Sequence, residues 1–212
     1  MRLRNVKNAN EIVANSEYVI KNPTELKGNI KSVFNNNNPI HLEIGCGKGK
    51  FIIDMALKYP NINFIGVEKY ESVLVRAIQK LDNTEVKNLK FVRMDAIDID
   101  EVFSNEINTL YLNFSDPWPK AKHAKRRLTS PVFLKKYDLI FNGLPHIVQK
   151  TDNIYLFGYS LSSLSKHGYT LNDVSLDLES TEITNVLTEY ESKFMASGVK
   201  INYLDAVKYE KK

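Results

Sequence analysis

The chain has 212 residues, 43% of them hydrophobic and 25% charged, which is the balance of one ordinary domain of α/β size. No apolar run of about 18 residues occurs and the start at Met1 does not resemble a secretory leader, so we expect a cytoplasmic protein that contacts no membrane. A single cysteine, Cys46, and four scattered histidines give no disulfide and no zinc-site spacing, so no metal is expected.

Apolar runs and helical periodicity alternate from residue 39 onward. In chain order they predict a strand at 39–44, a helix at 50–59, a strand at 63–67, a helix at 71–81, and strands at 89–94 and 109–114. Parallel strands joined through helices form βαβ crossovers, with helices on both faces of the sheet. The sequence therefore predicts a doubly wound, mostly parallel α/β fold.

The C-terminal half continues the alternation. It predicts a helix at 131–141, a strand at 146–151, a helix at 153–168 that Gly168 ends, and two final strands within 169–178 and 200–210. No repeat or linker divides the chain. We therefore expect one domain over 39–212, preceded by a polar N-terminal extension, 1–38, that shows little pattern.

A glycine-rich turn, "EIGCGKGK" (43–50), leaves the first strand and enters the first helix. Gly45 and Gly47 allow positive φ angles and a close approach of backbone to ligand. Lys50 stands where a dinucleotide fingerprint has its third glycine, which weakens a nicotinamide-binding interpretation without excluding it. A tight turn that binds no ligand explains the glycines about as well.

Three acids follow three neighbouring strands: Glu43, Glu68 and Asp95. Open α/β sheets bind ligands at the carboxyl ends of their strands, although each acid alone is as compatible with a helix cap. The chemistry suits S-adenosylmethionine, because Glu68 can accept both ribose hydroxyls and Asp95, followed by Ala96, can accept from the adenine amino group. Glu43 can meet the ammonium of the methionine part or orient the glycine turn.

Four blocks of sequence together resemble the bacterial tRNA (guanine-N7)-methyltransferases: "EIGCGKGKF" (43–51), "YLNFSDPWPKAKHAKRR" (111–127), "KTDN" (150–153) and "TEYESKF" (188–194). The resemblance covers residues 39–195. It implies a class I, Rossmann-like methyltransferase fold with seven strands, the last one antiparallel. It also implies that S-adenosylmethionine donates a methyl group to N7 of a guanine in the tRNA variable loop (position 46), by a monomer or a homodimer.

The resemblance also assigns residues. Cofactor contacts are expected from Glu43, Gly45, Gly47, Glu68, Asp95, Ala96 and Asp116, with Asp116 also the catalytic residue. Substrate contacts are expected from Lys120, Asp152, Thr188, Glu189, Tyr190 and Glu191, and RNA contacts from Lys122, His123, Lys125, Arg126 and Arg127. Two departures matter: Ala121 replaces a common second cation, and the turn before the strand at 146–151 lacks the usual double glycine, which leaves its shape open.

Asp116 and Trp118 each precede a proline, which predicts that both are held extended just beyond the strand at 109–114. N7 of guanine has no proton to lose, so methyl transfer requires alignment more than a general base. Asp116 is therefore interpreted as a positioner that accepts from guanine N1–H and the N2 amino group. Trp118 is as compatible with a packing anchor as with a base-stacking residue.

Alternatives remain open at this stage. The cations from Lys120 to Arg127 would hold RNA phosphates, but charge runs are usually solvated faces. The block "TEYESKF" is also a good first turn of a helix, with acids at its positive end. A nicotinamide-dependent dehydrogenase and a non-enzymatic RNA-binding module are the two rival functions.

Overall fold

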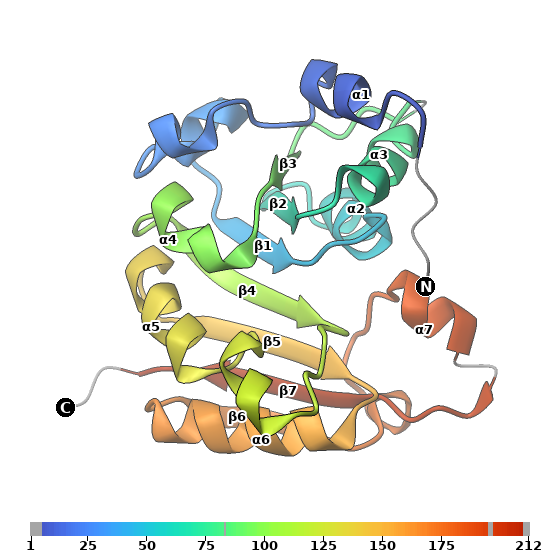
Figure 1. Ribbon diagram of the computed structural model, residues 1–212. Coiled ribbons are helices and arrows are strands. Elements are labelled where there is room, and N and C mark those ends of the chain that lie inside the picture. The colour runs from blue at the N-terminus through green and yellow to red at the C-terminus, as the bar shows by residue number, and fades with distance from the viewer. Residues whose placement is uncertain (1–5, 83, 195–196, 210–212) are drawn as a thin grey trace.

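The computed structural model describes residues 6–82, 84–194 and 197–209. Its centre is one seven-stranded sheet in the order β3-β2-β1-β4-β5-β7-β6 (Figure 1). The strands are β1 (Ile40–Ile44), β2 (Asn63–Glu68), β3 (Leu89–Arg93), β4 (Ile107–Asn113), β5 (His146–Thr151), β6 (Thr170–Ser175) and β7 (Asn202–Val207). The first five strands in this order, from β3 through β2, β1 and β4 to β5, are mutually parallel. Strand β7 runs antiparallel to both β5 and β6. The predicted fold, including the antiparallel last strand, is confirmed.

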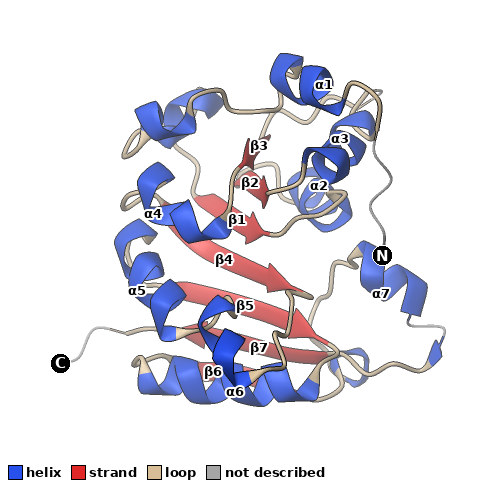
Figure 2. Cartoon of the chain, viewed as in Figure 1, coloured by secondary structure: helices blue, strands red, loops and turns tan. Residues whose placement is uncertain are grey.

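Helices lie on both faces of the sheet (Figure 2). One face packs on α4 (Ile99–Val102), α5 (Pro131–Ile140) and α6 (Ile154–Lys166), and the other on α1 (Ala9–Asn15), α2 (Lys50–Lys58) and α3 (Glu71–Gln79). All six residues of β2 are buried because both faces of this strand are covered. The remaining helix, α7 (Glu189–Phe194), lies at the edge where β4 and β5 end (Figure 1).

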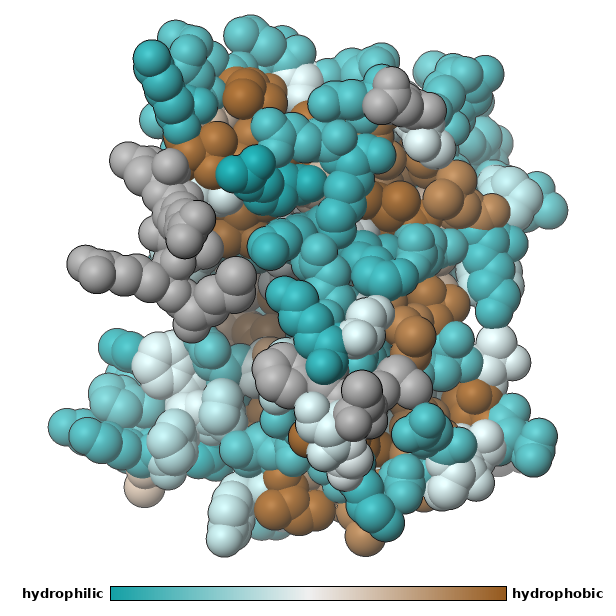
Figure 3. Space-filling model, turned by 90° about the vertical axis from the view of Figure 1, so that its right-hand side faces the viewer, coloured by the Kyte–Doolittle hydropathy of each residue, from teal (hydrophilic) through white to brown (hydrophobic). Residues whose placement is uncertain are grey.

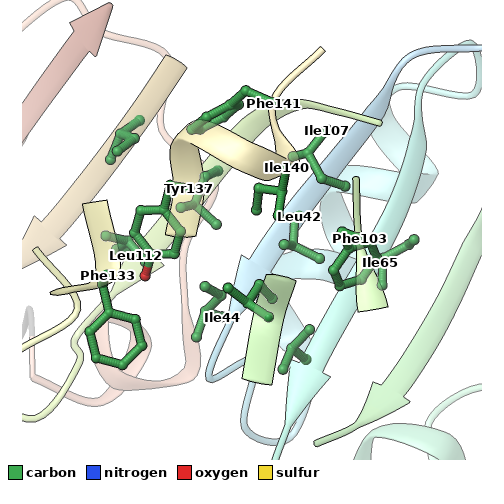
Figure 4. Packing of buried hydrophobic residues seen from close by; sticks show 14 of the residues in the cluster. Leu42, Ile44, Ile65, Phe103, Ile107, Leu112, Phe133, Tyr137, Ile140 and Phe141 are labelled. Carbon is green, nitrogen blue, oxygen red and sulfur yellow. The ribbon is translucent and has the colours of Figure 1, made fainter. Parts of the chain in front are cut away.

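The larger apolar cluster fills the space between the sheet and α5. Leu42 and Leu112 are fully buried and lie opposite Tyr137 and Ile140 of α5 (Figure 4). Burial of each such side chain stabilises the fold by about 1.5–3 kcal/mol. The central strands are therefore held firmly enough to fix the positions of the loops that follow their carboxyl ends.

The described part of the N-terminal segment is integrated into the fold. It contains α1 and two 3₁₀ turns, η1 (Pro23–Leu26) and η2 (Ile30–Phe34), and buries Val13, Ile30 and Phe34. The Glu106 carboxylate accepts hydrogen bonds from the backbone N–H groups of Gly28 and Ile30. The sequence analysis missed these elements because their apolar residues follow no regular period.

The predicted strands and helices are otherwise present, with small differences at their ends. Strand β4 begins at Ile107, two residues earlier than predicted, and the short helix α4 was not predicted. The turn before β5 needs a single glycine, since Gly143 alone has a positive φ of 78° there. This explains why the chain tolerates the loss of a double glycine.

Within the described residues, no helix is long and apolar enough to cross a membrane. The same part of the chain contains no group of three or more His, Cys, Asp or Glu side chains arranged to hold a metal ion.

Candidate active site

Five acids lie at or just beyond the carboxyl ends of five adjacent parallel strands. In sheet order they are Asp95 after β3, Glu68 at the end of β2, Glu43 on β1, Asp116 after β4 and Asp152 after β5. Figure 3 views the molecule from this side, where hydrophilic side chains cover much of the middle. The sheet therefore brings together the acids that the sequence analysis selected.

The glycine turn between β1 and α2 is an open, left-handed loop. Gly45, Gly47 and Gly49 have φ angles of 76°, 59° and 76°, which other residues adopt at a cost. A Cβ on Gly45 would meet no atom within 4 Å, whereas one on Gly49 would lie 2.7 Å from Cβ of Ala77. Gly49 thus provides the close helix packing that a third fingerprint glycine would give, so Lys50 is tolerated next to it.

Glu68 fastens this loop to the end of β2. Its Oε2 accepts from Gly47 N at 3.1 Å and its Oε1 from Tyr70 N at 2.9 Å. Each carboxylate oxygen has a second lone pair, so Glu68 can still accept from the two hydroxyls of a ribose.

Glu43 is almost fully buried and only half satisfied. Asn113 Nδ2 donates to its Oε1 at 2.9 Å, whereas Glu43 Oε2 and Asn113 Oδ1 have no hydrogen-bond partner in the described protein. Burial raises the pKa of Glu43 to about 7, against the hydrogen bond from Asn113 and the attraction of Lys150. Two acceptors on hydrogen-bonded side chains are thus left without a donor, which suits a cationic donor such as an ammonium group.

Asp95 lies at the β3 end of this row of acids, where it is partly exposed. Its carboxylate accepts from Lys69 Nζ at 2.6 Å and from Ile97 N at 3.2 Å. The hydrogen bond from Lys69 is the main reason that the pKa of Asp95 is lowered. Asp95 therefore stays ionised at neutral pH, and both Asp95 and the following Ala96 remain partly accessible at the loop.

These residues fit S-adenosylmethionine. The loop offers an approach without Cβ atoms at Gly45, Glu68 can accept from a diol, and the unsatisfied pair at Glu43 and Asn113 suits an ammonium group. The bound group would supply a methyl group on a sulfonium ion, and the protein would supply its orientation.

The Asp116 elbow differs in one respect from the prediction. Asp116 is exposed, but Phe114 and Trp118 have φ angles of 49° and 42°, so Trp118 is left-handed and not extended. The expectation for Trp118 was wrong because the rule for residues before proline disfavours right-handed helix and does not decide between the remaining regions.

Arg127 holds this elbow in place. Its Nε donates to the Pro117 carbonyl at 3.1 Å, its Nη2 to the Trp118 carbonyl at 3.0 Å, and its guanidinium lies 4.3 Å from the ring centroid of Tyr159. Arg127 was predicted as an RNA contact, and in this structure its contacts are intramolecular. They satisfy backbone carbonyls that the left-handed turn exposes.

The other predicted RNA contacts face outward from the 3₁₀ turn η4 (Ala121–Arg126). Arg126 lies 4.8 Å from the Trp118 ring centroid, and His123 is tilted against the same ring at 5.8 Å. The side chains of Lys120, Lys122 and Lys125 are exposed. These residues form a basic surface next to Asp116, and the half-buried Trp118 packs against Arg126 and His123.

Helix α7 meets the end of β4 through an aromatic pair. The Tyr190 ring stacks on Phe114 with centroids 4.6 Å apart, and the Tyr190 hydroxyl donates to Asp152 Oδ2 at 2.7 Å. The hydrogen bond to Asp152 is the main cause that raises the pKa of Tyr190 to about 12. Tyr190 and Asp152, both predicted substrate contacts, thus contact each other, and Tyr190 also contacts Phe114, which lies two residues before Asp116.

Thr188 and Glu191 form a capping box at the start of α7. Glu191 N donates to Thr188 Oγ1 at 3.1 Å, and Thr188 N donates to Glu191 Oε2 at 2.7 Å. Both side chains are buried, while Glu189 pairs at 2.7 Å with Lys80 near the surface. The interpretation of "TEYESKF" as a helix start is confirmed, and in this conformation Thr188 and Glu191 face inward.

Sequence analysis missed three residues of the site: Asn113, Phe114 and Lys150. Their signal was weak, because an Asn, a Phe or a Lys near the end of a strand has many ordinary explanations. Only the pairing of β1, β4 and β5 places them against Glu43, Tyr190 and Glu191.

Comparisons with known proteins agree with this geometry. A family model described as "Putative methyltransferase" matches residues 37–204. Among solved structures, a 16S rRNA methyltransferase, KamB, superposes with a TM-score of 0.66 at 13% identity, covering 86% of this chain and 94% of that one. An antibiotic-related methyltransferase gives a TM-score of 0.63 at 19% identity, covering 86% of this chain and 94% of that one. The fold and the family model together define a methyltransferase of class I type.

Curated relatives are much closer in sequence. A protein of Lachnoclostridium phytofermentans is 48% identical over 209 residues, covering 97% of this chain and 98% of its own. One from a Geobacillus species is 51% identical and covers 100% of this chain and 97% of its own, and one from Bacillus subtilis is 48% identical, covering 95% and 96%. All three carry the name tRNA (guanine-N(7)-)-methyltransferase. This chain belongs to the tRNA (guanine-N(7)-)-methyltransferase family.

Proposed function

We propose that this protein transfers a methyl group from S-adenosylmethionine to N7 of a guanine in the tRNA variable loop, at position 46, and so forms 7-methylguanosine. The observation that carries the proposal is the match, at 48% identity over 97% of this chain, to a relative named for that base and that RNA. The five acids along the strand ends supply the groups that the reaction needs.

The cofactor half of the site would bind through Glu43, Gly45, Gly47, Glu68, Asp95 and Ala96. Glu68 would accept from the ribose diol and Asp95 from the adenine amino group. The ammonium group of the cofactor would donate hydrogen bonds to Glu43 Oε2 and Asn113 Oδ1, which have no other partner. The bound S-adenosylmethionine would supply a methyl group carried on a positively charged sulfur, and after its transfer to N7 the positive charge would lie on the purine.

Asp116 would act on the guanine from the other side. It would accept from guanine N1–H and the N2 amino group, so that N7, on the opposite edge, faces the methyl group. Its negative charge also favours the cation that forms on the purine. The arrangement requires no general base, because N7 reacts through a lone pair.

The remaining predicted contacts would hold the RNA. Asp152 and Tyr190 would lie on the side of the guanine site opposite Asp116, and Lys120 would lie at its entrance. The exposed cations of η4 and His123 would contact phosphates, which position RNA without reading its sequence.

An unmodified tRNA transcript, S-adenosylmethionine and the purified protein provide the test. Mass spectrometry of digested nucleosides should detect 7-methylguanosine, and a fragment-level digest should place it in the variable loop. A transcript with adenine at that position is the matched control and should give no product. Methylation elsewhere, or none with either transcript, would refute the proposal.

A further inference from the structure

The segment that leads into α7 lies over a cavity instead of a packed core. A cavity of about 280 Å³ is lined by side chains of α2, β4, β5 and β7, and by Thr184, Asn185 and Val186 of this segment. Apolar packing beneath the segment is therefore incomplete, and other contacts must fix its position.

Lys150 provides those contacts from the end of β5. Its Nζ donates to Glu191 Oε2 at 2.8 Å, to the Val186 carbonyl at 2.9 Å and to Asn185 Oδ1 at 3.1 Å. These three bonds use all three protons of the ammonium group. The side chain is only 4% exposed, so water does not compete for them.

The acceptors of Lys150 are also bonded to one another. Asn185 Nδ2 donates to Glu191 Oε1 at 3.0 Å, and Glu191 Oε2 accepts from Thr188 N in the capping box. Although burial alone would raise the pKa of Glu191, the attraction of Lys150 and these hydrogen bonds hold it below its usual value. A closed network therefore connects one buried cation to both ends of the segment 185–191.

The network ends at the guanine side of the site. Tyr190 precedes Glu191, stacks on Phe114 and donates to Asp152, and Phe114 lies two residues before Asp116. A shift of α7 would move Tyr190 away from the strained residue, Phe114, that leads into the catalytic elbow.

We propose that Lys150 is a positioning residue, whose buried ammonium group fixes α7 at the end of β4 and so keeps Tyr190 aligned with Phe114, Asp152 and the Asp116 elbow. The placement of α7 follows from the contacts alone. Its consequence for methyl transfer rests on the proposed function.

Hydrogen exchange tests the placement without any activity measurement. Lys150→Met keeps much of the length of the side chain and removes all three donors. Peptides that cover 185–193 should exchange at least tenfold faster in this variant, while peptides from β1 to β3 should keep their wild-type rates. Wild-type exchange in 185–193 would overturn the proposal.

A second variant separates positioning from the cost of an unpaired buried charge. Lys150→Met leaves Glu191 ionised without its partner, which can destabilise the whole fold. The double variant Lys150→Met/Glu191→Gln removes that charge and should fold, yet α7 should still exchange rapidly. Full recovery of slow exchange in the double variant would show that Lys150 only balances charge, and would overturn the proposal.

A matched control removes another ion pair of α7, the one with Lys80, which follows α3. Lys80→Met removes the partly exposed ion pair with Glu189 and should leave the exchange of 185–193 near the wild-type rate. With tRNA, the double variant should lose at least tenfold in single-turnover methyl transfer and keep its cofactor affinity. Absent activity in the wild type would refute the proposed function, and the exchange data would still decide the role of Lys150.

Discussion

The two halves of the candidate site are held by different kinds of contact. At the ends of β2 and β3, carboxylates accept from backbone N–H groups: Glu68 from Gly47 N and Tyr70 N, and Asp95 from Ile97 N as well as from the Lys69 side chain. At the ends of β4 and β5, the contacts join side chains far apart in sequence, as in Tyr190 with Phe114 and Asp152. The proposed cofactor half thus rests partly on backbone N–H groups, and the proposed guanine half on side-chain contacts of one helix.

The first and largest expected effect concerns the second half. Asp116→Asn keeps the shape and one acceptor but removes the charge, so single-turnover methyl transfer should fall by at least about 100-fold. Cofactor and tRNA affinity should be mostly retained, because the interaction matters chiefly in the transition state. Rapid-quench measurement with saturating tRNA, beside equilibrium binding of each ligand, provides the comparison.

Two controls sharpen this prediction. Wild-type single-turnover rates should show a plateau across neutral pH, since no base is needed. Replacing the target guanine by inosine removes the N2 amino group, which should penalise the wild type far more than Asp116→Asn. Equal inosine penalties in the two proteins would contradict the positioning role of Asp116.

The next expected effect concerns the cofactor half in the absence of ligand. Glu43 has a folded-state pKa raised to about 7, so between its ordinary value and pH 7 the folded protein binds a proton that the unfolded chain has lost. Stability should therefore fall as pH rises through this window, by up to about 3 kcal/mol at about 1.4 kcal/mol per pKa unit. Glu43→Gln should flatten this part of the profile in urea titrations. An unchanged slope would mean that Glu43 is already ionised.

A smaller effect is expected at Glu68. Glu68→Ala should raise the dissociation constant for S-adenosylmethionine by about tenfold or more, because charge-assisted hydrogen bonds contribute about 1.5–3 kcal/mol. Calorimetry measures this directly, and tRNA affinity should be unaffected. Because Glu68 also holds Gly47, Glu68→Gln is a useful partner, since it keeps one acceptor for the loop. Normal cofactor binding in both variants would show that Glu68 does not contact the cofactor.

The contrast between the halves also explains how much the sequence could predict. The strands, the helices α2, α3, α5 and α6, and the acids at 43, 68 and 95 follow from regular periodicity, because each acid needs only its place at a strand end. The roles of Lys150, Asn113 and Arg127 depend on which strands and loops become neighbours, which no local pattern encodes. Thr188 and Glu191 illustrate the limit: the sequence indicates a helix start, and only the structure shows that they form a capping box and that Glu191 contacts Lys150.

The smallest expected effect compares two adjacent arginines. The exposed Arg126 has its guanidinium over the Trp118 ring, whereas Arg127 donates to the carbonyls of Pro117 and Trp118. Arg126→Ala should reduce the slope of log affinity against log salt by up to about 0.7–0.9 for one lost phosphate contact, and leave the single-turnover rate nearly intact. Arg127→Ala should leave the salt slope unchanged and lower the single-turnover rate severalfold, because the Asp116 elbow loses the two hydrogen bonds from Arg127. Filter binding of tRNA over a salt series and rapid-quench kinetics on both variants separate the two roles. If Arg127→Ala lowers the salt slope as much as Arg126→Ala at an unchanged rate, Arg127 belongs to the RNA surface and the elbow is held by its prolines alone.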